Sequence, residues 1–394
     1  MLKNEVDATL SRWLVPRLRM LSTCWKRRVC WGRLCVFSSV AGAIVGVHLF
    51  LVGPTPSRAA RVNTLVERQL NDAWRMYVKR FVSPQGRVID DANGDISHSE
   101  GQGYAMLIAA RLKDRVTFDR LWAWSRANLF VRSDHLPAWV WDPQTDPHVR
   151  DIDDASDGNI LIAWALFEAG KQWAVDDYLS VARKMAESVA RLDTEPSRYG
   201  LVLLPGSRGF RLRDRPADGP IVNLSYWVFP AFRHLKHATS AVDWKQITAS
   251  GLSVIADARF GSDKMPTDWI SLADVKAAAA RGFPSVFGYD AIRIPLYLAW
   301  GRPNDRSALE VFAPLLTSAR IRSPSVIDLR TGKAQEPFKE NGYRSIPMLL
   351  KCALYGTSFS RAFYDVQPEL YYPTTLHILA LLAAQDSYPS CLRG

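Results

Sequence analysis

The sequence predicts an all-α protein, and two observations support this fold class. Between Arg61 and the C-terminus, apolar residues recur every three or four positions in most segments, which is the spacing of amphipathic or buried helices. The connections between these segments are short, and no long Gly/Ser-rich or Pro-rich linker and no short repeat interrupts residues 61–394. We therefore expect one domain of about eleven or twelve helices. A bundle, a solenoid and a closed ring of helices all fit this pattern.

The N-terminal half of the domain begins with an amphipathic pattern over 65–81. Its apolar stripe consists of Leu65, Leu70, Ala73, Trp74 and Tyr77. The same spacing predicts further helices at 103–112, 118–130, 159–173 and 174–192.

The C-terminal half continues the pattern with six more segments. They are 223–236, 243–257, 290–300, 306–318, 345–355 and 374–385. Gly170 and Gly301 are expected to end two of the helices. Strands are expected to be few, with one short pair near 201–212. The loops at one end of the helices are expected to carry the functional residues.

Composition and charge exclude several classes of protein. The chain of 394 residues is 48% hydrophobic, which is too apolar for a disordered chain and too polar for a multi-pass membrane protein. Its net charge of +11 is concentrated at the N-terminus, because nine Lys and Arg against two acids give residues 1–60 a charge of +7. The remaining +4 on residues 61–394 argues against a nucleic-acid-binding protein.

Residues 1–60 form a separate targeting region. After the basic stretch comes Val36–Val52, which contains no Lys, Arg, Asp or Glu and is followed by GPTPSRAA. This order predicts a cleaved secretory signal, with translation starting at Met1 or Met20, or else a retained membrane anchor. A periplasmic or secreted protein is expected, whose only membrane contact would be this segment.

The cysteines agree with export. Three of the five lie in or beside the targeting region, and Cys352 and Cys391 remain in the domain. These two would be able to pair in an oxidising compartment, although the sequence leaves their proximity open. No Cys/His cluster has the spacing of a zinc site, so neither a metal nor a cofactor is expected.

Glu100 is the first acidic residue in an unusual place. It lies in SHSEGQGYAM (97–106), at the start of an apolar helix, and Gly101 and Gly103 permit close approach of a ligand. An acid at a helix N-terminus also has a purely structural explanation, because it interacts favourably with the helix dipole.

The second acidic segment is RDIDDASDGNILIAWALFEAG (150–170). Its acids are Asp151, Asp153, Asp154 and Asp157. Capping of the following helix needs only one of them, and their mutual repulsion can raise a pKa. A metal cluster is a weaker interpretation, since no His is in phase with these acids.

Asp290 and Arg293 form the third candidate, in FGYDAIRIPLYLAW (287–300). They lie one helical turn apart within an apolar run. They are either a partly buried structural ion pair, or a site in which Arg293 keeps Asp290 ionised so that it can act as a base.

Paired carboxylates and many aromatic rings are typical of proteins that hydrolyse sugars, which need an acid, a base and flat platforms for the pyranose rings. The chain has 14 Trp, and several aromatic residues lie near the acidic segments. The candidate platforms are Tyr104, Trp139, Trp141, Trp164, Tyr226, Trp227 and Trp269. Each could equally be a core residue. Trp139 and Trp141 alternate next to prolines in AWVWDP, so we expect one of them to face a cleft.

The motifs SEGQGYAM, ASDGNILIAWALFEAGKQW and YDAIRIP, in this order, resemble glycoside hydrolase family 8. AWVWDP, NLSYW, MPTDW and ELYYPTTLHILALLAA fit the same pattern, and the resemblance extends over residues 65–386. It implies an (α/α)6 barrel with a long cleft and hydrolysis with inversion.

By motif match, the resemblance implies that Glu100 is the general acid, Asp290 the general base, and Asp157 a residue that binds and distorts the sugar. Tyr226 and Tyr371 match positions near the site. One departure is Asn159, where the family usually has a second acid.

Within the family, the chain is most similar to endoglucanases that accompany bacterial cellulose synthesis. The expected activity is therefore an endo-1,4-β-glucanase on cellulose-like chains, with a β-glucan as substrate and a cellulose-synthase complex as a possible partner. The alternatives are a related hydrolase of xylan, chitosan or mixed-linkage glucan, and a non-catalytic glycan-binding or assembly protein on the same scaffold.

Overall fold

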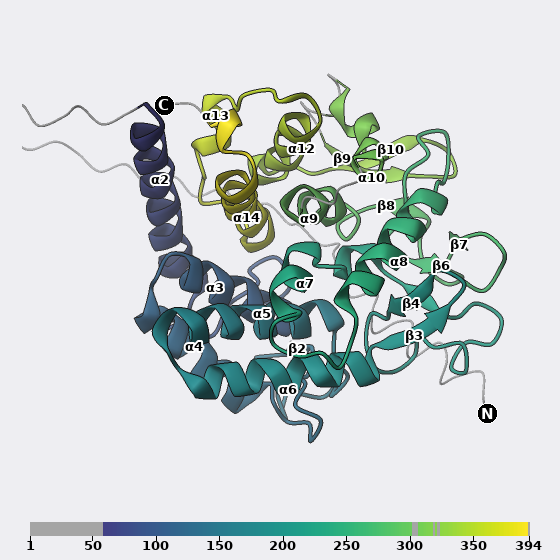
Figure 1. Cartoon of the computed structure of the whole chain (residues 1–394), viewed down its shortest axis with the longest axis horizontal. Coiled ribbons are helices and arrows are strands. Elements are labelled where there is room, and N and C mark those ends of the chain that lie inside the picture. Colours follow the sequence, from purple (N-terminus) through teal and green to yellow (C-terminus); the bar gives the residue numbers. More distant parts are fainter. Residues whose placement is uncertain (1–57, 302–305, 318–319, 321–323, 393–394) are drawn as a thin grey trace, which may run out of the picture.

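The computed structural model describes residues 58–301, 306–317, 320 and 324–392, with the side chains of 58–64 excepted. Six inner helices and six outer helices in this part of the chain form an (α/α)6 barrel (Figure 1). The inner helices are α3 (Ser99–Arg111), α5 (Ser156–Trp173), α7 (Phe229–Leu235), α9 (Arg293–Gly301), α12 (Ser345–Tyr355) and α14 (Tyr371–Ser387). The outer helices are α2 (Arg58–Phe81), α4 (Arg115–Asn128), α6 (Asp176–Leu192), α8 (Trp244–Asp257), α10 (Ser307–Glu310) and α13 (Arg361–Tyr364).

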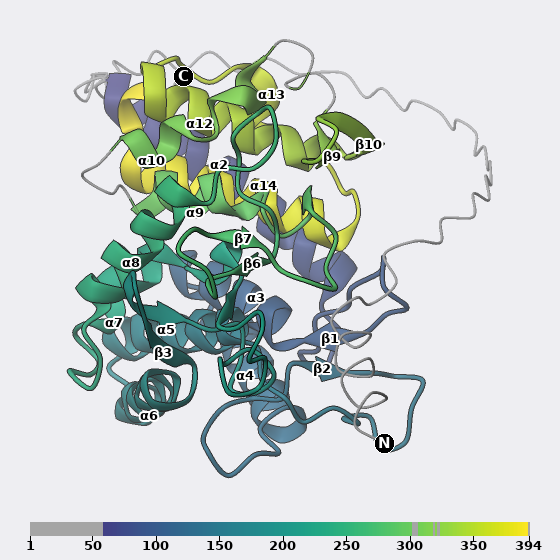
Figure 2. The same cartoon turned by 90° about the vertical axis from the view of Figure 1, so that its right-hand side faces the viewer.

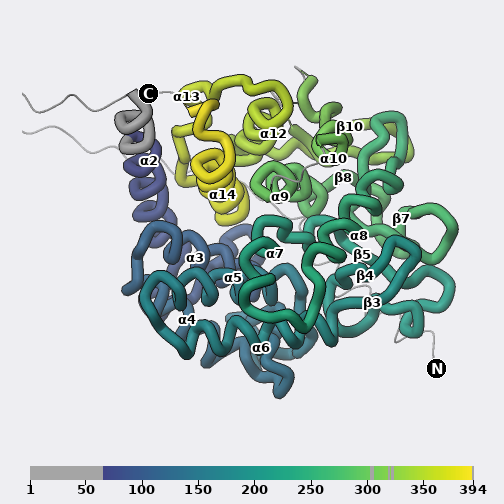
Figure 3. The backbone as a smooth tube through the Cα atoms, in the orientation of Figure 1, coloured from purple at the N-terminus to yellow at the C-terminus, as the bar shows by residue number. Residues whose placement is uncertain are grey.

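The inner helices close into a ring. Along the chain each inner helix contacts the next, from α3 through α5, α7, α9 and α12 to α14, and α14 contacts α3 again. Helix α2 packs beside α14, although the two lie at opposite ends of the domain sequence (Figure 3). Of the three architectures that fit the sequence, the structure is the closed ring.

Burial separates the inner helices from the outer ones. Helix α14 is buried along nearly its whole length, as is α3, so neither helix presents a broad polar face to water. Helix α6 instead buries one stripe, formed by Ala182, Met185, Ala186 and Val189, and exposes the rest. An outer helix needs only one apolar face because its other side meets water.

Glycines set the distance between the first two inner helices. A Cβ on Gly158 would collide with Ser99, and a Cβ on Gly103 would lie 2.6 Å from Cβ of Leu161. The starts of α3 and α5 therefore lie closer together than larger residues would allow.

The predicted helices are confirmed, with differences at their ends. Three inner helices begin three or four residues earlier than the apolar pattern suggests, at Ser99, Ser156 and Tyr371. The first turns of α3 and α5 carry polar residues that the apolar periodicity does not register, whereas the first turn of α14 is formed by Tyr371, Tyr372 and Pro373, ahead of the regular apolar spacing.

Other boundaries differ because of proline and glycine. The segment 223–236 divides into a 3-10 turn at Leu224–Tyr226 and helix α7, which has Pro230 in its first turn. The segment 306–318 divides into α10 and a 3-10 turn at Ala313–Leu316, which has Pro314 as its second residue. Gly170 does not end α5, which continues to Trp173 and is terminated by Ala174 in the left-handed conformation. Helix α9 ends at Gly301, as predicted.

The β-structure is more extensive than expected but consists of very short strands. All pairings of the described strands are antiparallel. Two sheets have two strands each: β1 (Ser97–His98) with β2 (Val140–Trp141), and β3 (Thr194–Ser197) with β4 (Gly200–Leu203). Two sheets have three strands each: β6 (Ile270–Ser271) lies between β5 (Ile221–Val222) and β7 (Ala278–Ala279), and β9 (Ser325–Asp328) lies between β8 (Val286–Phe287) and β10 (Lys333–Pro337). Figure 2 shows β1, β2, β6, β7, β9 and β10 spread across one side of the ring. The predicted pair near 201–212 is shifted, because β4 pairs with the preceding β3. Strands of two to five residues are too short to produce a period-2 signal.

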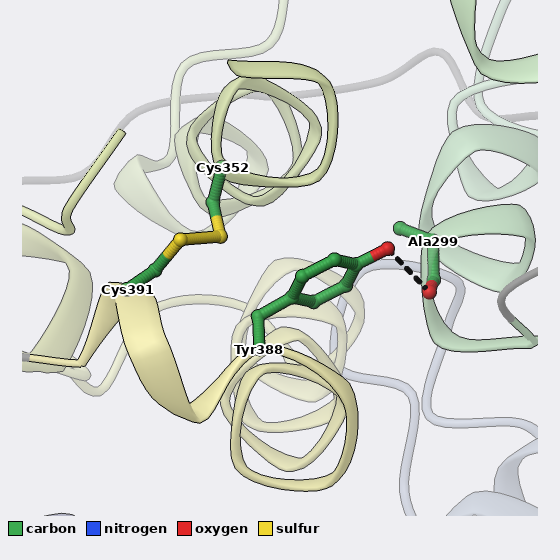
Figure 4. Close-up of a disulfide and its surroundings, with 4 residues drawn as sticks. All are labelled: Ala299, Cys352, Tyr388 and Cys391. Atoms are coloured by element: carbon green, nitrogen blue, oxygen red, sulfur yellow. Dashed lines mark hydrogen bonds between the residues drawn. A yellow bond between two sulfur atoms is a disulfide. The ribbon is translucent and has the colours of Figure 1, made fainter. Parts of the chain in front are cut away.

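A disulfide joins Cys352 in α12 to Cys391 near the C-terminus, with their Cα atoms 6.2 Å apart (Figure 4). Beside it, the Tyr388 hydroxyl donates a hydrogen bond to the carbonyl oxygen of Ala299, at 2.9 Å. The chain end after α14 is thereby attached to both α12 and α9.

Loss of this disulfide is expected to destabilise the domain. Replacing both Cys352 and Cys391 by Ser should lower the free energy of unfolding by about 2–4 kcal/mol, because the bridge closes a long loop in the unfolded chain. Urea unfolding with and without a reductant measures the effect. The reductant should have no effect on the double variant, and equal midpoints for the oxidised wild type and the variant would contradict the expectation.

The predicted signal or anchor at 1–57 lies outside the described residues. Among the described residues, no helix combines the length and the apolar character needed to cross a bilayer.

Candidate active site

A cleft of about 540 Å³ opens where three inner helices begin. Its walls include the first residues of α3 and α5 and the residues just before and within the start of α9. Further walls come from the loops around β6 and β8 and from the β9–β10 hairpin. Since these helices all start at the same end of the ring, the three acidic segments of the sequence converge there.

Arg293 is the centre of this convergence. Its Nη1 donates to Oε1 of Glu100 and to Oδ2 of Asp157, the latter at 3.1 Å. Its Nη2 donates to Oδ1 of Asp290 at 3.1 Å and to Oγ of Ser225 at 2.9 Å. With a side chain only 2% exposed, a single guanidinium links all three candidate carboxylates.

The two carboxylate oxygens of Glu100, a residue of the cleft wall, have different neighbours. Besides Arg293, the Tyr104 hydroxyl donates to Oε1 at 3.0 Å. The other oxygen, Oε2, lies 3.7 Å from Nδ1 of His98. The side chain is 16% exposed, so it is sheltered yet reachable from the cleft.

Asp157 is the most deeply buried of the three acids. Burial, aided by the negative charge of Asp290, raises its pKa to about 7, although a backbone hydrogen bond from Gly158 acts in the opposite direction. At neutral pH this carboxyl is therefore present in both protonation states.

Asp290 lies just before α9 rather than within it, and backbone and side-chain contacts hold it. The Asn223 amide donates to its Oδ2 at 3.1 Å. Asp268 Oδ1 accepts hydrogen bonds from the backbone N–H of Gly288 at 2.8 Å and of Ala291 at 2.9 Å, which flank Asp290. Sequence reasoning gave no individual role to Asn223, Ser225, Asp268 or His98, although the first three lie in the quoted motifs NLSYW and MPTDW.

The arrangement of the acids suits an acid–base reaction across a bond. Glu100 and Asp290 bind opposite nitrogens of one planar group, so the guanidinium separates them. An inverting hydrolase needs about 6.5–9.5 Å between its two carboxyls to admit a water molecule.

Three of the predicted aromatic platforms lie in the cleft wall, and two of them, Trp139 and Tyr226, contact charged side chains. Trp139 is half-buried there, and its indole N–H donates to Asp151 at 3.0 Å. Tyr226 also lines the cleft, with its ring 5.6 Å from the Arg293 guanidinium carbon. Trp141 instead packs against Trp124 and His148, outside the residues that line the cleft. Of the alternating pair, Trp139 is thus the one that faces the cleft, as expected.

Three of the predicted substrate contacts do not expose a ring to the cleft. Trp227 is fully buried and donates its indole N–H to the carbonyl of Ile247 at 3.0 Å, so it belongs to the core between α7 and α8. Tyr104 is also fully buried, and only its hydroxyl reaches Glu100 from below. Tyr371 is fully buried beneath His98. The inner helices bury every face, so helical position alone does not separate core rings from cleft rings.

Trp269 and Trp164, the remaining candidate platforms, divide in the same way. Trp269 lines the cleft and stacks on Phe283, whereas Trp164 is buried against Trp300.

Asn159 lies beside the site in a buried polar cluster. Its amide donates to Asp154 at 2.9 Å and to Asp193 at 3.0 Å. Burial and the neighbouring Asp154 raise the pKa of Asp193 well above its ordinary value. Asp154 therefore belongs to this buried structural cluster, whereas Asp157 binds Arg293 in the cleft. Within the described ranges, no three His, Cys, Asp or Glu side chains are grouped as a metal site would require.

Replacing Asp157 by Asn should stabilise the protein increasingly as pH rises. The pKa of Asp157 is above its unfolded value of 3.8, so the folded state holds an extra proton between about pH 4 and 7. Wild-type stability should fall across this window by up to about 1.4 kcal/mol per pH unit from this group, and the variant lacks that loss. Urea unfolding at pH 5 and pH 8 tests this, with the exposed Asp119→Asn as control. If the free energies of unfolding of Asp157→Asn and the wild type differed by the same amount at pH 5 and at pH 8, the expectation would be contradicted.

Comparison with known proteins places the chain among sugar-cleaving enzymes. The model of the glycosyl hydrolases family 8 matches residues 60–386. An endoglucanase of Cellulomonas uda is 35% identical over 262 residues, which cover 66% of this chain and 72% of the relative. A probable endoglucanase of Novacetimonas hansenii is 34% identical over 317 residues, with 79% and 90% covered. The solved endo-beta-1,4-glucanase of Acetobacter xylinum superimposes with a TM-score of 0.72 at 32% identity, over 82% of this chain and 99% of that one.

Proposed function

The chain belongs to glycosyl hydrolase family 8, and from this premise we propose that it is an endo-1,4-β-glucanase that cleaves internal bonds of cellulose-like chains with inversion. The observation that carries the proposal is the set of three carboxylates on Arg293 at the base of the cleft. A non-catalytic glycan-binding protein would have no need for a cluster whose burial is this costly.

Glu100 and Asp290 divide the reaction between them. Protonated Glu100 gives its proton to the glycosidic oxygen as the bond between that oxygen and the anomeric carbon breaks. Asp290, ionised beside Arg293, accepts a proton from the water that attacks the anomeric carbon from the opposite face. The products are two shorter chains, and the new reducing end has the α configuration.

Asp157 holds the sugar at the cleavage point. Its contact with the same Arg293 nitrogen that binds Glu100 supports a role for its carboxyl beside the ring that must distort towards the transition state. Trp139 and Tyr226 in the cleft wall provide ring surfaces for the neighbouring glucose units.

The activity is tested with soluble carboxymethyl-cellulose and a panel of xylan, chitosan and mixed-linkage glucan. Rapid loss of viscosity relative to reducing-end release indicates internal cleavage, and proton NMR of fresh products identifies the anomer. Initial β-anomer, or turnover only on a polymer other than β-1,4-glucan, would overturn the proposal.

Export and an association with cellulose synthesis are part of the same proposal. The basic and apolar N-terminal region and the disulfide between Cys352 and Cys391 support an oxidising compartment outside the cytoplasm. The similarity to the Novacetimonas hansenii protein supports a cellulose-producing setting. Fractionation of cells that produce the full chain tests export, and co-purification with a membrane cellulose synthase tests the partner. Recovery with free thiols from the cytoplasm would contradict export.

A further inference from the structure

His98 is a cleft residue that the acid–base mechanism leaves without a role. It precedes α3 as the N-cap residue, and its Nδ1 accepts the backbone N–H of Gly101 at 3.0 Å. Its Nε2 lies 3.4 Å from Oδ2 of the buried Asp90. A ring nitrogen that accepts a hydrogen bond carries no proton, so this geometry defines a neutral imidazole with its proton on Nε2.

The same nitrogen faces the catalytic carboxyl. Nδ1 of His98 is 3.7 Å from Oε2 of Glu100, whereas Oε1 receives Arg293 and the Tyr104 hydroxyl. Two donors on Oε1 concentrate negative charge there, which leaves Oε2 as the oxygen that carries the proton. A neutral His98 adds no positive charge near Oε2 and so does not oppose that proton.

We propose that His98 is a positioning residue for the general acid: as a neutral imidazole it caps α3 and keeps the Glu100 proton on Oε2, and its protonation disables the acid. The inference rests on the proposed function of Glu100. A second proton on Nδ1 would break the bond from Gly101 and turn the ring into a donor towards Oε2, which would favour the Glu100 carboxylate.

The groups around His98 are consistent with this role. Asp90 faces Nε2, Glu100 faces Nδ1, and the Tyr371 ring packs edge-on at 5.6 Å from α14. Asp90 also accepts hydrogen bonds from the Asn93 side chain and the Ala92 backbone N–H. Burial acts to raise the pKa of Asp90, but these two bonds and the contact with His98 outweigh it, so the pKa of Asp90 lies below its ordinary value. Burial raises the pKa of the Tyr371 phenol well above its usual value, so that phenol stays neutral. Strand β2, which pairs with the His98 backbone, places Val140 opposite and adds no charge.

Two substitutions separate the functions of the ring nitrogens. His98→Asn retains an acceptor at the Nδ1 position that can cap Gly101 but does not titrate, whereas His98→Gln retains a group at the Nε2 position and loses the cap. His98→Asn should keep more of the wild-type kcat at neutral pH than His98→Gln does, and should move the acidic limb of its pH profile to lower pH by about half a unit or more. His98→Gln should lose about tenfold in kcat with little change in KM. Superimposable pH profiles for wild type and His98→Asn, or equal kcat values for the two variants, would overturn the proposal.

A second measurement does not depend on turnover. In protein labelled with ¹⁵N-histidine, the His98 signals are assigned by their loss in His98→Asn. The proposal requires the Nε2–H form at neutral pH and a lower titration midpoint in Glu100→Gln, but not in the remote Asp119→Asn. An Nδ1–H form or an unchanged midpoint overturns the inference about His98. A wild-type protein that satisfies both requirements but cleaves no β-glucan contradicts the proposed function instead.

Discussion

Replacing Glu100 by Gln or Asp290 by Asn is expected to lower kcat for β-glucan hydrolysis by about 10²–10⁴-fold, with little loss of oligosaccharide binding. Both changes preserve the size of the side chain and its contact with Arg293, so the cleft should retain its shape. Reducing-end release gives kcat, and calorimetric titration with a cello-oligosaccharide gives the affinity. Near-normal turnover in either variant would disprove the role assigned to that residue.

A substrate with an activated leaving group separates the two roles. An aryl cello-oligosaccharide that releases 2,4-dinitrophenolate needs no proton from a general acid, but it still needs an activated water. Glu100→Gln should therefore recover most of its loss on this substrate, and Asp290→Asn should not. The reverse pattern would mean that Asp290 is the general acid and Glu100 the general base.

Replacing Arg293 by Met should destabilise the protein by about 3–5 kcal/mol at pH 7. The substitution removes the guanidinium that binds Glu100, Asp157 and Asp290 and leaves three sheltered acids to repel one another. Urea unfolding at pH 7 measures the loss, which should shrink at pH 5 as the carboxyls take up protons. A loss under about 1 kcal/mol at pH 7 would contradict the central role of this residue.

Two further variants isolate the charge effect. Arg293→Lys keeps a positive charge but has a single nitrogen, which cannot reach the acids from two positions, so we expect an intermediate loss. Adding Asp157→Asn to Arg293→Met removes one of the uncompensated acids and should restore part of the stability. With the wild type, Arg293→Met, Asp157→Asn and their combination form a double-mutant cycle. The coupling energy between the two positions should be clearly different from zero.

The helical domain and the segments of the site were predictable from local pattern. Apolar spacing locates each main helix, and the three acidic segments stand out because acids are unusual at the starts of apolar helices. The first turns of α3 and α5 were missed by three or four residues because their polar residues interrupt the spacing. Polar first turns before an apolar inner helix are therefore a signal for site residues.

The roles of individual aromatic residues were not predictable in the same way. A period of 3.6 residues tells which face of a helix is apolar, but the inner helices are apolar on all faces. The sequence around the core rings does not differ from that around the cleft rings in any periodic feature. Only packing puts Trp227, Tyr104 and Tyr371 in the core, and Trp139 and Tyr226 in the cleft wall.

By itself the sequence determined the all-α class and the three acidic segments, because each depends on neighbours along the chain, and on the same basis it predicts an N-terminal targeting region. Closure of the helices into a ring, the pairing of Cys352 with Cys391 and the meeting of Glu100 with Arg293, 193 positions away, were decided only by the tertiary structure. The reason is that local spacing sets which residues form a helix, whereas the charges that share one guanidinium depend on which helix ends come together in space.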